Sequence, residues 1–356
     1  MKTAVIGGGN IGTLLAAEML RKGHEVTVYT SRPGEWKEEI SVLDASDAVL
    51  WRAKTYRATD QIGEALQSAA LVFITMPAQM FPALAQLMEP YIRKDMMLGV
   101  VPGSGGAEFI FSDWIKKGST LFGFQRVHSI ARIRKYGEAV YMLGRKPELY
   151  LASIPSSQTA AVASIMESIF DLPCICLPNY LSVTLTPSNP ILHTTRLYRL
   201  FADYKPGMVY ADNYLFYKEW DDESSQLLID CDQELQRLCS VIPLDLKHVK
   251  SLREHYESDS VSAMTRKIRS IEAFQSLRSP MKKAAGGWVP DFESRYFVAD
   301  FSYGLKILKE IAMLFDVPVP HMTRVWDWYR SVDVKGAEHS FELDMKKEDL
   351  IALYSL

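Results

Sequence analysis

The stretch Thr3-Ala4-Val5-Ile6-Gly7-Gly8-Gly9-Asn10-Ile11-Gly12 joins a short apolar run to a glycine-rich turn of the form G-x-G-x-x-G. The apolar run suits a buried strand, and the apolar residues between Leu14 and Leu20 recur at helical spacing. A strand, this turn and a helix, in that order, make up the phosphate-binding unit of dinucleotide-binding domains. The sequence therefore predicts a Rossmann-type domain that binds a dinucleotide near the N-terminus.

Each glycine of the motif has a physical role in that prediction. Gly7 allows the tight turn, Gly9 lets a pyrophosphate approach the backbone, and Gly12 lets the helix pack closely on the strand. The helix N-terminus offers unpaired N–H groups and a positive dipole end. We therefore expect Gly7, Gly9, Asn10, Ile11 and Gly12 to contact the cofactor. A glycine-rich turn without a ligand is the alternative.

The end of the second expected strand, residues 25–30, indicates which dinucleotide is bound. NAD-selective sites carry an acidic residue about 20 positions beyond the glycine motif. This chain has Thr30-Ser31-Arg32 at that place, with no carboxylate. Two hydroxyl groups and a guanidinium suit the 2′-phosphate of NADPH. NADPH is the expected cofactor and NADH the alternative, in which case Arg32 is a solvated surface residue.

Composition limits the class of protein. The 356 residues exceed one typical core, so two domains are expected. A net charge of −3 argues against nucleic acid as a partner. The sequence has no apolar stretch of about 18 residues and no leader peptide, which favours a cytoplasmic protein without membrane contact. The four cysteines lack paired metal-site spacing, so no metal is expected.

The alternation of strand and helix patterns predicts the fold. Up to about residue 180 it indicates an α/β domain with a doubly wound parallel sheet, and long helical patterns dominate beyond. We place the domains at 1–183 and 184–356. Ligands of such sheets lie beyond the carboxyl ends of the strands, so Met76 and Pro77, which follow an expected strand, should lie near the cofactor. Plain turns are the alternative.

Two segments of the second domain carry residue types suited to hydride-transfer chemistry. The first, residues 186–196, contains Asn189 and His193, and the second, residues 293–305, contains Arg295 and Asp300. Histidine suits acid–base catalysis near neutral pH, and a carboxylate on its other ring nitrogen fixes its tautomer. An arginine can hold a substrate carboxylate. Spacing alone does not bring these residues together, and a structural histidine is the alternative.

The chain resembles the octopine/nopaline (opine) dehydrogenase family over most of its length. The resemblance rests on the glycine motif, on Asn189-Pro190-Ile191-Leu192-His193, and on Arg295-Tyr296-x-x-x-Asp300 leading into Tyr303-Gly304-Leu305. Members of that family join a 2-oxo acid to the amino group of an amino acid, using NADH or NADPH. The resemblance implies a mostly helical second domain similar to the C-terminal domain of 6-phosphogluconate dehydrogenase.

The resemblance also implies roles for single residues. His193 would be the acid–base group, Asp300 its partner, and Arg295 the contact for substrate carboxylates. Asn189 is the second expected substrate-binding residue; it would shape the turn that presents His193, and a contact with the cofactor is a further option. The expected partners are therefore two small molecules, an amino acid and a 2-oxo acid such as pyruvate. A homodimer is one option for the assembly.

Two departures from the family pattern affect specificity. Thr194 stands where a proline often follows the histidine, and Ala299 stands where an acidic residue often precedes the aspartate. They leave the identity of the amino acid open.

Two alternatives to an opine dehydrogenase remain. One is a ketopantoate-reductase-like 2-oxo acid reductase, although residues 180–200 contain no lysine that could serve it. The other is a nonenzymatic NADPH-binding sensor.

Overall fold

The chain folds into two compact units. The computed structural model describes residues 1–54 and 56–356. The first unit consists of Met1–Thr184 together with Ile351–Leu356, and the second is Leu185–Leu350. Buried apolar side chains fill the interior of both units.

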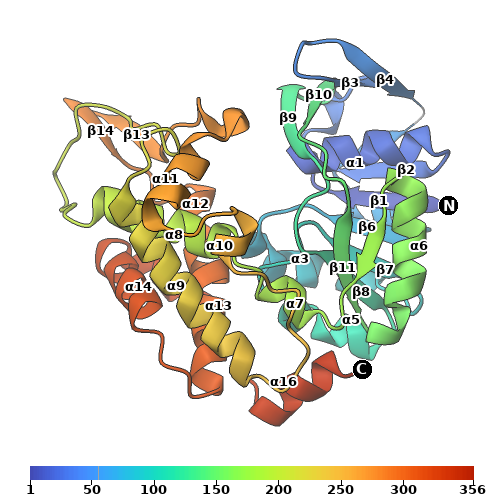
Figure 1. Cartoon of the computed structure of the whole chain (residues 1–356). Coiled ribbons are helices and arrows are strands. Elements are labelled where there is room, and N and C mark those ends of the chain that lie inside the picture. Colours follow the sequence, from blue (N-terminus) through green and yellow to red (C-terminus); the bar gives the residue numbers. More distant parts are fainter. Residues whose placement is uncertain (55) are drawn as a thin grey trace. The chain divides into compact units, whose positions relative to one another are not determined.

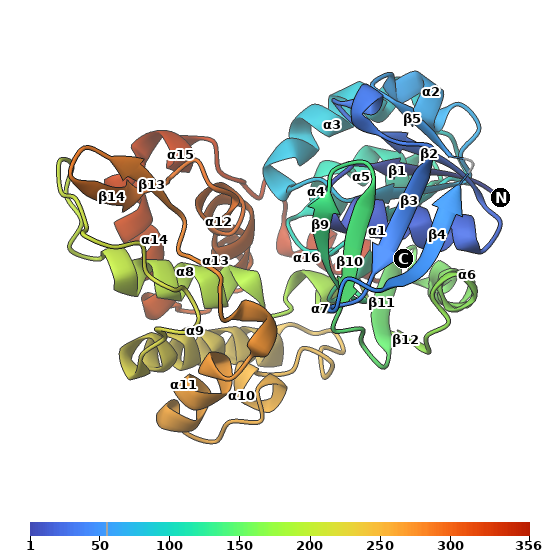
Figure 2. The ribbon, with the colours of Figure 1, turned by 90° about the horizontal axis from the view of Figure 1, so that it is seen from above.

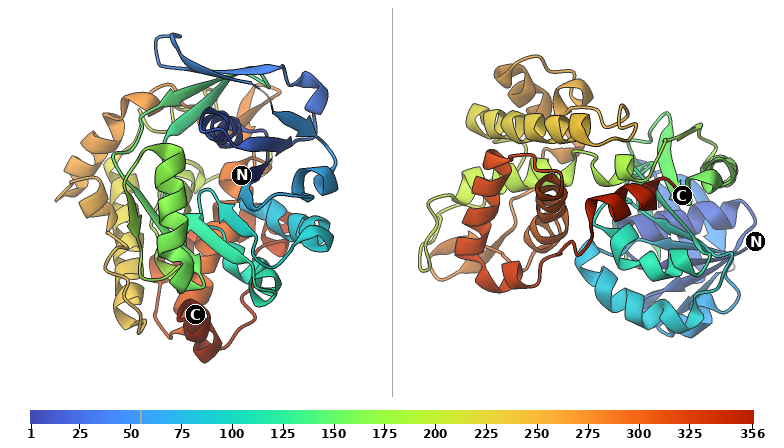
Figure 3. Two further views of the ribbon diagram at one scale, coloured as in Figure 1. Left: turned by 90° about the vertical axis from the view of Figure 1, so that its right-hand side faces the viewer. Right: turned by 90° about the horizontal axis from the view of Figure 1, so that it is seen from below.

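The C-terminal segment lies in a different unit from the one expected. We expected the second domain to run over 184–356, but Ile351–Leu356 belongs to the first unit. The Tyr354 hydroxyl donates a hydrogen bond of 2.7 Å to the buried Glu108 carboxyl, so the red end of the chain lies beside this earlier segment (Figure 3). No sequence pattern indicated this contact, because it joins residues 246 positions apart.

An eight-stranded sheet forms the centre of the first unit (Figure 1). Its strands are β1 (Lys2–Ile6), β2 (Glu25–Tyr29), β5 (Arg57–Thr59), β6 (Leu71–Ile74), β7 (Met97–Val100), β8 (Thr120–Phe124), β11 (Leu149–Ile154) and β12 (Cys174–Cys176). They lie in the order β12-β11-β8-β7-β6-β1-β2-β5, and neighbours are parallel except for the antiparallel pair β8 and β11. The chain therefore reverses direction across the sheet at β1, as in doubly wound folds. The predicted Rossmann-type sheet is confirmed.

Most helices of the first unit connect these strands. The helices are α1 (Asn10–Arg21), α2 (Ile62–Leu66), α3 (Phe81–Met88), α4 (Ala107–Ile110), α5 (Ser112–Lys116), α6 (Thr159–Phe170) and α7 (Leu181–Thr184), and the last of them follows β12. All four residues of β6 are apolar and buried, as expected for a parallel strand that is covered on both faces.

A second, four-stranded sheet covers α1 (Figure 1). It consists of β3 (Glu39–Leu43), β4 (Val49–Lys54), β9 (Ile130–Lys135) and β10 (Ala139–Leu143), in the order β4-β3-β10-β9. Leu15 and Met19 of α1 share one apolar cluster with Val42 of β3 and Val140 of β10. The apolar run at residues 139–143 predicts the strand β10, but no pattern indicates the β3–β4 pair, because β4 is largely exposed and lacks a clear apolar face.

The second unit is mostly helical, as expected. Its helices are α8 (Asn189–Phe201), α9 (Asp222–Val241), α10 (Leu252–His255), α11 (Val261–Arg269), α12 (Arg295–Val298), α13 (Lys306–Leu314), α14 (Pro320–Val332), α15 (Val334–Glu338) and the start of α16 (Lys347–Tyr354). A short hairpin, β13 (Met281–Ala284) and β14 (Gly287–Pro290), completes it.

Helix α8 is the centre of the second unit. It packs against α9, α14 and a π-helical turn at Phe301–Leu305 (Figure 2). Residues 190–197 of α8 are all buried, and His193 and Arg196 are among them. Buried polar groups need hydrogen-bonding partners, so each of these two side chains must have such partners inside the unit.

Among the helices of the described residues, none is both long enough and apolar enough to cross a membrane.

Glu108, on α4, is a fully buried carboxyl group inside the first unit. Its Oε1 accepts hydrogen bonds from the hydroxyls of Thr184 and Tyr354. Its Oε2 is buried and has no hydrogen-bond partner within the described part of the chain. Burial raises the pKa of Glu108 from 4.5 to about 7, although the two hydroxyl donors oppose the shift. The carboxyl group is therefore mostly protonated below neutral pH.

This raised pKa predicts a pH-dependent stability. A carboxyl group whose folded-state pKa exceeds its unfolded value destabilises the fold as pH rises from about 4.5 to 7. Glu108→Gln lacks this loss. The free energy of unfolding of the variant, relative to that of the wild type, should therefore rise by about 3 kcal/mol between pH 4.5 and pH 8. Urea denaturation at several pH values measures this difference. Parallel curves for the two proteins would show that Glu108 is ionised in both states.

Candidate active site

The glycine loop between β1 and α1 has the backbone geometry that its motif predicts. Gly7 has a φ of +115°, a conformation that residues with side chains rarely adopt. A Cβ on Gly12 would overlap the Gly7 carbonyl group and lie 2.8 Å from Thr75 Oγ1. Gly7 and Gly12 are therefore required by the fold, because the helix starts in close contact with the end of the strand.

The first turn of α1 can receive an anionic ligand. A Cβ built on Gly9, the N-cap residue, would meet no atom within 4 Å. No side chain caps this helix, and its first turn contains no acidic residue. Free N–H groups and the positive dipole end at such a helix start attract phosphate groups. The residues present therefore fit the pyrophosphate of a dinucleotide.

The side chains of Asn10 and Ile11 are used inside the protein. Asn10 Oδ1 accepts a hydrogen bond of 2.7 Å from the backbone N–H of Ile133, which ties the start of α1 to β9. Ile11 packs on the apolar cluster between α1 and the sheets. The backbone groups of these two residues therefore remain available to a cofactor.

The three residues after β2 differ in exposure. Thr30 is buried, and its hydroxyl lies 2.5 Å from the Tyr136 hydroxyl and accepts a hydrogen bond from Arg32 N–H. Ser31 and Arg32 are exposed. The Arg32 guanidinium lies 3.8 Å from the centre of the Tyr136 ring and pairs with Glu35 at 3.3 Å. Thr30 shapes this loop, and Ser31 and Arg32 present their polar groups outward.

The loop after β6 lies against the glycine loop. A Cβ on Gly7 would be 3.1 Å from Met76 Sδ, and Pro77 follows it, half-buried. A Cβ on Gly105 would in turn be 2.6 Å from the Ala78 Cβ. The loops after β6 and β7 therefore lie together beside the glycine loop, at the carboxyl ends of neighbouring parallel strands.

In the second unit, His193 and Asp300 form a buried pair. His193 Nδ1 and Asp300 Oδ2 are 2.7 Å apart, although 107 positions separate the two residues in the chain. The side chains are 4% and 12% exposed. A carboxylate can only accept hydrogen bonds, so this contact suits the imidazole form that carries a proton on Nδ1.

A glycine and a proline bring the two members of the pair together. Asp300 immediately precedes the π-helical turn Phe301–Leu305, whose Leu305 N–H donates to the Asp300 carbonyl at 2.8 Å. A Cβ on Gly304 would lie 3.0 Å from Pro190 Cγ in the first turn of α8. The missing side chain at Gly304 therefore lets this turn approach α8 closely. Single π-turns of this kind are frequent at functional sites.

Aromatic side chains enclose the His193 ring. The Tyr296 ring lies 4.4 Å from it between centroids, and the Phe216 ring lies edge-on at 5.6 Å. These contacts restrict rotation of the imidazole and exclude water from its faces. The ring is therefore held in one orientation before any ligand binds.

The second ring nitrogen of His193 also has a partner. His193 Nε2 lies 2.9 Å from the hydroxyl of Tyr217, which is 5% exposed. Sequence reasoning missed this residue, because Tyr217 lies outside both motif segments and no spacing rule connects it to His193. The only signal was its place in the aromatic run Phe216-Tyr217, which is equally typical of a core.

Arg295 lies near this pair at the start of α12. Its exposed guanidinium stands 5.7 Å from the centre of the Tyr296 ring, which packs on His193. Burial raises the pKa of the Tyr217 hydroxyl well above its usual value, and the positive charge of Arg295 opposes this shift. An exposed cation therefore lies against the Tyr296 ring that packs on His193.

Asn189 is the first residue of α8, one helical turn before His193. Residues four apart lie on the same face of a helix, so Asn189 and His193 share one side of α8. Asn189 is half-buried, whereas His193 is buried. The structure thus gathers all four residues that the sequence selected in the second domain around the N-terminal half of α8 and the turn that packs on it.

The two units together define a class of protein. A Rossmann-type unit with a glycine loop of this kind is typical of proteins that bind a nicotinamide dinucleotide, and the helical unit carries a buried His–Asp pair. Dehydrogenases that depend on NAD or NADP combine these two kinds of unit, and this chain is such an enzyme.

Comparison with known families gives the particular one. The model described as "NAD/NADP octopine/nopaline dehydrogenase, alpha-helical domain" matches residues 176–332, and that of the "NAD-dependent glycerol-3-phosphate dehydrogenase N-terminus" matches residues 2–104. The chain belongs to the octopine/nopaline (opine) dehydrogenase family, as the resemblance in its sequence indicated. It is an NAD(P)H-dependent oxidoreductase that acts on CH–NH bonds.

Individual relatives agree with this assignment. Octopine dehydrogenase of Mizuhopecten yessoensis is 25% identical, with 92% of this chain and 89% of the relative covered. A solved octopine dehydrogenase with NADH and L-arginine has a TM-score of 0.79 at 22% identity, covering 93% and 89% of the two chains. A yersinopine dehydrogenase with bound NADP+ has a TM-score of 0.69 at 15% identity, covering 100% and 98%. These structures share the fold of this chain.

Proposed function

We propose that the protein is an NADPH-dependent opine dehydrogenase that joins the amino group of an L-amino acid to a 2-oxo acid such as pyruvate. The observation that carries the proposal is the buried His193–Asp300 pair at 2.7 Å, with the exposed cation Arg295 against the Tyr296 ring that packs on His193. The pair provides acid–base chemistry, and the cation provides binding for a carboxylate. The 2-oxo acid and the L-amino acid of this reaction both carry carboxylates.

The chemistry begins with the attack of the free amine on the carbonyl carbon, which gives a carbinolamine. Its C–O bond then breaks as the nitrogen lone pair forms the C=N bond, and the leaving hydroxyl takes a proton to depart as water. His193 is the proposed source of that proton, and Asp300 stabilises the imidazolium. When bound, NADPH supplies the hydride that reduces the imine carbon.

Arg295 and Asn189 are the proposed substrate-binding residues. A guanidinium binds a carboxylate through two parallel hydrogen bonds, which fixes the 2-oxo acid in orientation as well as in place. Asn189, on the same face of α8 as His193, offers an amide that can bond to the carbonyl oxygen or to a carboxylate. Orientation of this kind contributes a large part of catalysis in two-substrate reactions.

The cofactor contacts are proposed at the glycine loop and beyond β2. The backbone of Gly7, Gly9, Asn10, Ile11 and Gly12 would hold the pyrophosphate. Ser31 and Arg32 would bind the 2′-phosphate, with Thr30 shaping their loop. Met76 and Pro77 would border the ribose and nicotinamide. The exposure of Arg32, together with the absence of an acidic residue at 30–32, supports NADPH over NADH.

Arg32→Ala tests the cofactor preference. A charge-assisted hydrogen bond contributes about 1.5–3 kcal/mol, so the variant should raise the KM for NADPH about 10- to 100-fold. The KM for NADH should stay within about twofold, because NADH has no 2′-phosphate. Glu35→Gln is the matched control: it frees Arg32 from its ion pair and should leave NADPH binding intact or stronger. Equal losses for both nucleotides would show that Arg32 does not read the phosphate.

The proposed reaction is tested by NADPH oxidation at 340 nm with pyruvate, in the absence and presence of the twenty amino acids. Oxidation that requires an amino acid supports imine reduction, and dividing the pool identifies the partner. Oxidation with pyruvate alone would instead indicate a simple 2-oxo acid reductase. Tight NADPH binding without turnover on any oxo acid and amine would indicate a binding protein.

A further inference from the structure

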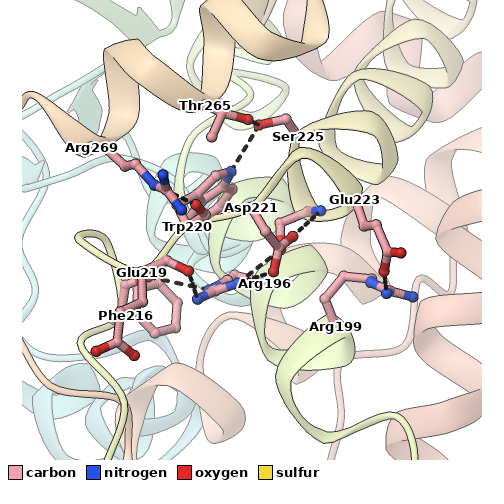
Figure 4. Close-up of polar contacts among 11 residues, drawn as sticks. Arg196, Arg199, Phe216, Glu219, Trp220, Asp221, Glu223, Ser225, Thr265 and Arg269 are labelled. Atoms are coloured by element: carbon pink, nitrogen blue, oxygen red, sulfur yellow. Dashed lines mark hydrogen bonds and ion pairs between the residues drawn. The ribbon is translucent and has the colours of Figure 1, made fainter.

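Arg196 is a buried cation on α8, three residues after His193. It is 1% exposed, and its guanidinium makes four hydrogen bonds to one short segment and the helix that follows (Figure 4). The acceptors are Phe216 O at 3.2 Å, Glu219 O at 2.6 Å, Asp221 Oδ2 at 2.9 Å and Ser224 Oγ at 3.0 Å. The cation therefore ties residues 216–221 to α8.

The ion pair at this cluster explains how the charge is tolerated. A buried guanidinium is costly unless a carboxylate and further acceptors surround it. Burial by itself would raise the pKa of Asp221, but hydrogen bonds from Ser224 and Arg196 reverse the shift, so its pKa lies below the usual value. Asp221 is ionised at neutral pH and also caps α9 by accepting from Ser224 N–H. Asp221, the last residue of the segment 216–221, is thus fixed both to Arg196 and to the start of α9.

A second cation holds the same segment from the other side. Arg269 Nε donates to the Trp220 carbonyl at 2.6 Å, and Trp220 Nε1 donates to Ser225 Oγ at 3.0 Å (Figure 4). Ser225 Oγ is in turn 2.7 Å from Thr265 Oγ1 on α11. The backbone from 216 to 221 therefore has little freedom to move away from α8.

Tyr217 is the residue that this fixed segment presents to His193. The carbonyl of the neighbouring Phe216 accepts a hydrogen bond from Arg196. The Tyr217 ring stacks on Phe274 at 4.7 Å between centroids. Its hydroxyl lies 2.9 Å from His193 Nε2. One turn of α8 thus carries both the imidazole and the cation that holds the imidazole's hydrogen-bonding partner.

We propose that Asp300, His193 and Tyr217 form one proton path, and that Arg196 is the positioning residue that holds Tyr217 in it. The inference rests on the proposed reductive condensation. In the dehydration step, Tyr217 O–H gives its proton to the leaving hydroxyl while His193 Nε2–H gives its proton to the Tyr217 oxygen. The carbinolamine C–O bond breaks, water leaves, and His193 becomes neutral. Tyr217 loses and gains one proton and stays a phenol.

Burial of Tyr217 is consistent with this role. Its pKa is raised well above the usual value by burial, so a free phenolate is unfavourable. A hydroxyl group can donate and accept at the same time, which is what passage of a proton requires. Phenylalanine keeps the ring and its stacking but removes both functions.

Tyr217→Phe is expected to lower kcat about 10- to 100-fold, the effect of one charge-assisted hydrogen bond, with an unchanged KM for NADPH. The double variant that combines Tyr217→Phe with His193→Ala shows whether Tyr217 acts through His193. If Tyr217 acts through His193, its substitution costs nothing further in the His193→Ala background. An equal loss in both backgrounds, or a Tyr217→Phe enzyme as fast as the wild type, would overturn the proton path.

Arg196→Lys tests the positioning role. Lysine keeps the charge opposite Asp221 but lacks the planar fork that reaches the two carbonyls. It should lower kcat about tenfold, as expected for one weakened hydrogen bond, and add nothing to Tyr217→Phe. Arg199→Lys is the matched control, because Arg199 lies on the same helix and pairs with Glu223 of α9 without contacting residues 216–221 (Figure 4). The role of Arg196 would be overturned if kcat fell equally in Arg196→Lys and Arg199→Lys. It would also be overturned if the losses of Arg196→Lys and Tyr217→Phe added in the double variant.

A readout without turnover separates this inference from the proposed function. In ¹⁵N NMR spectra, His193 should show Nδ1 protonated and Nε2 hydrogen-bonded. The Nε2 signal should shift in Tyr217→Phe and Arg196→Lys but not in Arg199→Lys. If no substrate pair is turned over, the proposed function fails, and these spectra still test the position of Tyr217. An Nε2 signal that none of the variants shifts would overturn the contact, whatever the reaction.

Discussion

His193→Ala is expected to lower kcat for NADPH oxidation by about 10²–10⁴-fold, the range that a general acid–base group contributes. The affinity for NADPH, measured by fluorescence titration, should change by less than about twofold. The physical reason is that the imidazole touches Asp300 and Tyr217 within the helical unit, whereas the residues proposed to hold the cofactor lie in the Rossmann unit.

Two further variants make this result specific. Asp300→Asn keeps the shape of the partner but replaces the carboxylate that fixes the tautomer, so kcat should again fall by about 10²-fold or more. The control is a second buried pair, in which His128 Nε2 lies 2.7 Å from Glu18 Oε2 inside the first unit. His128→Gln should lower the free energy of unfolding and leave kcat per folded molecule unchanged. Equal falls in NADPH affinity and kcat for His193→Ala would mean that His193 is structural.

Alanine substitutions at the two glycines of the first helical turn should have opposite signatures. Gly9→Ala adds a methyl group where no protein atom lies within 4 Å, so the protein should fold normally. The methyl group would occupy the place proposed for the pyrophosphate, so NADPH affinity should fall by about 100-fold or more, the loss of about 3 kcal/mol. Calorimetric titration with NADPH measures the affinity.

Gly12→Ala should damage the fold instead. Its Cβ would overlap the Gly7 carbonyl and lie 2.8 Å from Thr75 Oγ1, so strand and helix must separate. Overpacking of a tight contact costs about 1–3 kcal/mol or more, which thermal unfolding in the absence of cofactor should detect. Unchanged NADPH binding in Gly9→Ala, or an unchanged Tm in Gly12→Ala, would contradict the roles given to this loop.

The fold could be predicted because its signals are local. Strand, glycine turn and helix follow each other within the first 21 residues, and the β-α alternation behind them permits few topologies. The β3–β4 part of the second sheet escaped prediction because β4 is largely exposed and because β3 joins β10, a strand from a distant part of the chain. The docking of Tyr354 on Glu108 escaped for the same reason, since a single long-range hydrogen bond leaves no periodic pattern.

The candidate site could be predicted only in part. The resemblance to opine dehydrogenases selected His193, Asp300, Arg295 and Asn189, and the structure gathers them in one unit. Sequence spacing could not predict that His193 and Asp300 meet, because their contact depends on Gly304 letting a π-helical turn approach α8. Arg196 and Tyr217 carried no motif. A buried arginine one turn from the proposed acid–base histidine becomes informative only once its acceptors are known.

The measurement that tests the central claim most directly is product analysis with NADPH that carries deuterium at both positions of nicotinamide C4. With pyruvate and the amino acid selected from the pool, the product should be a secondary amine dicarboxylate with one deuterium on the former carbonyl carbon. His193→Ala should form far less of it. Deuterated lactate, formed without the amino acid, would contradict the account and make the protein a simple 2-oxo acid reductase.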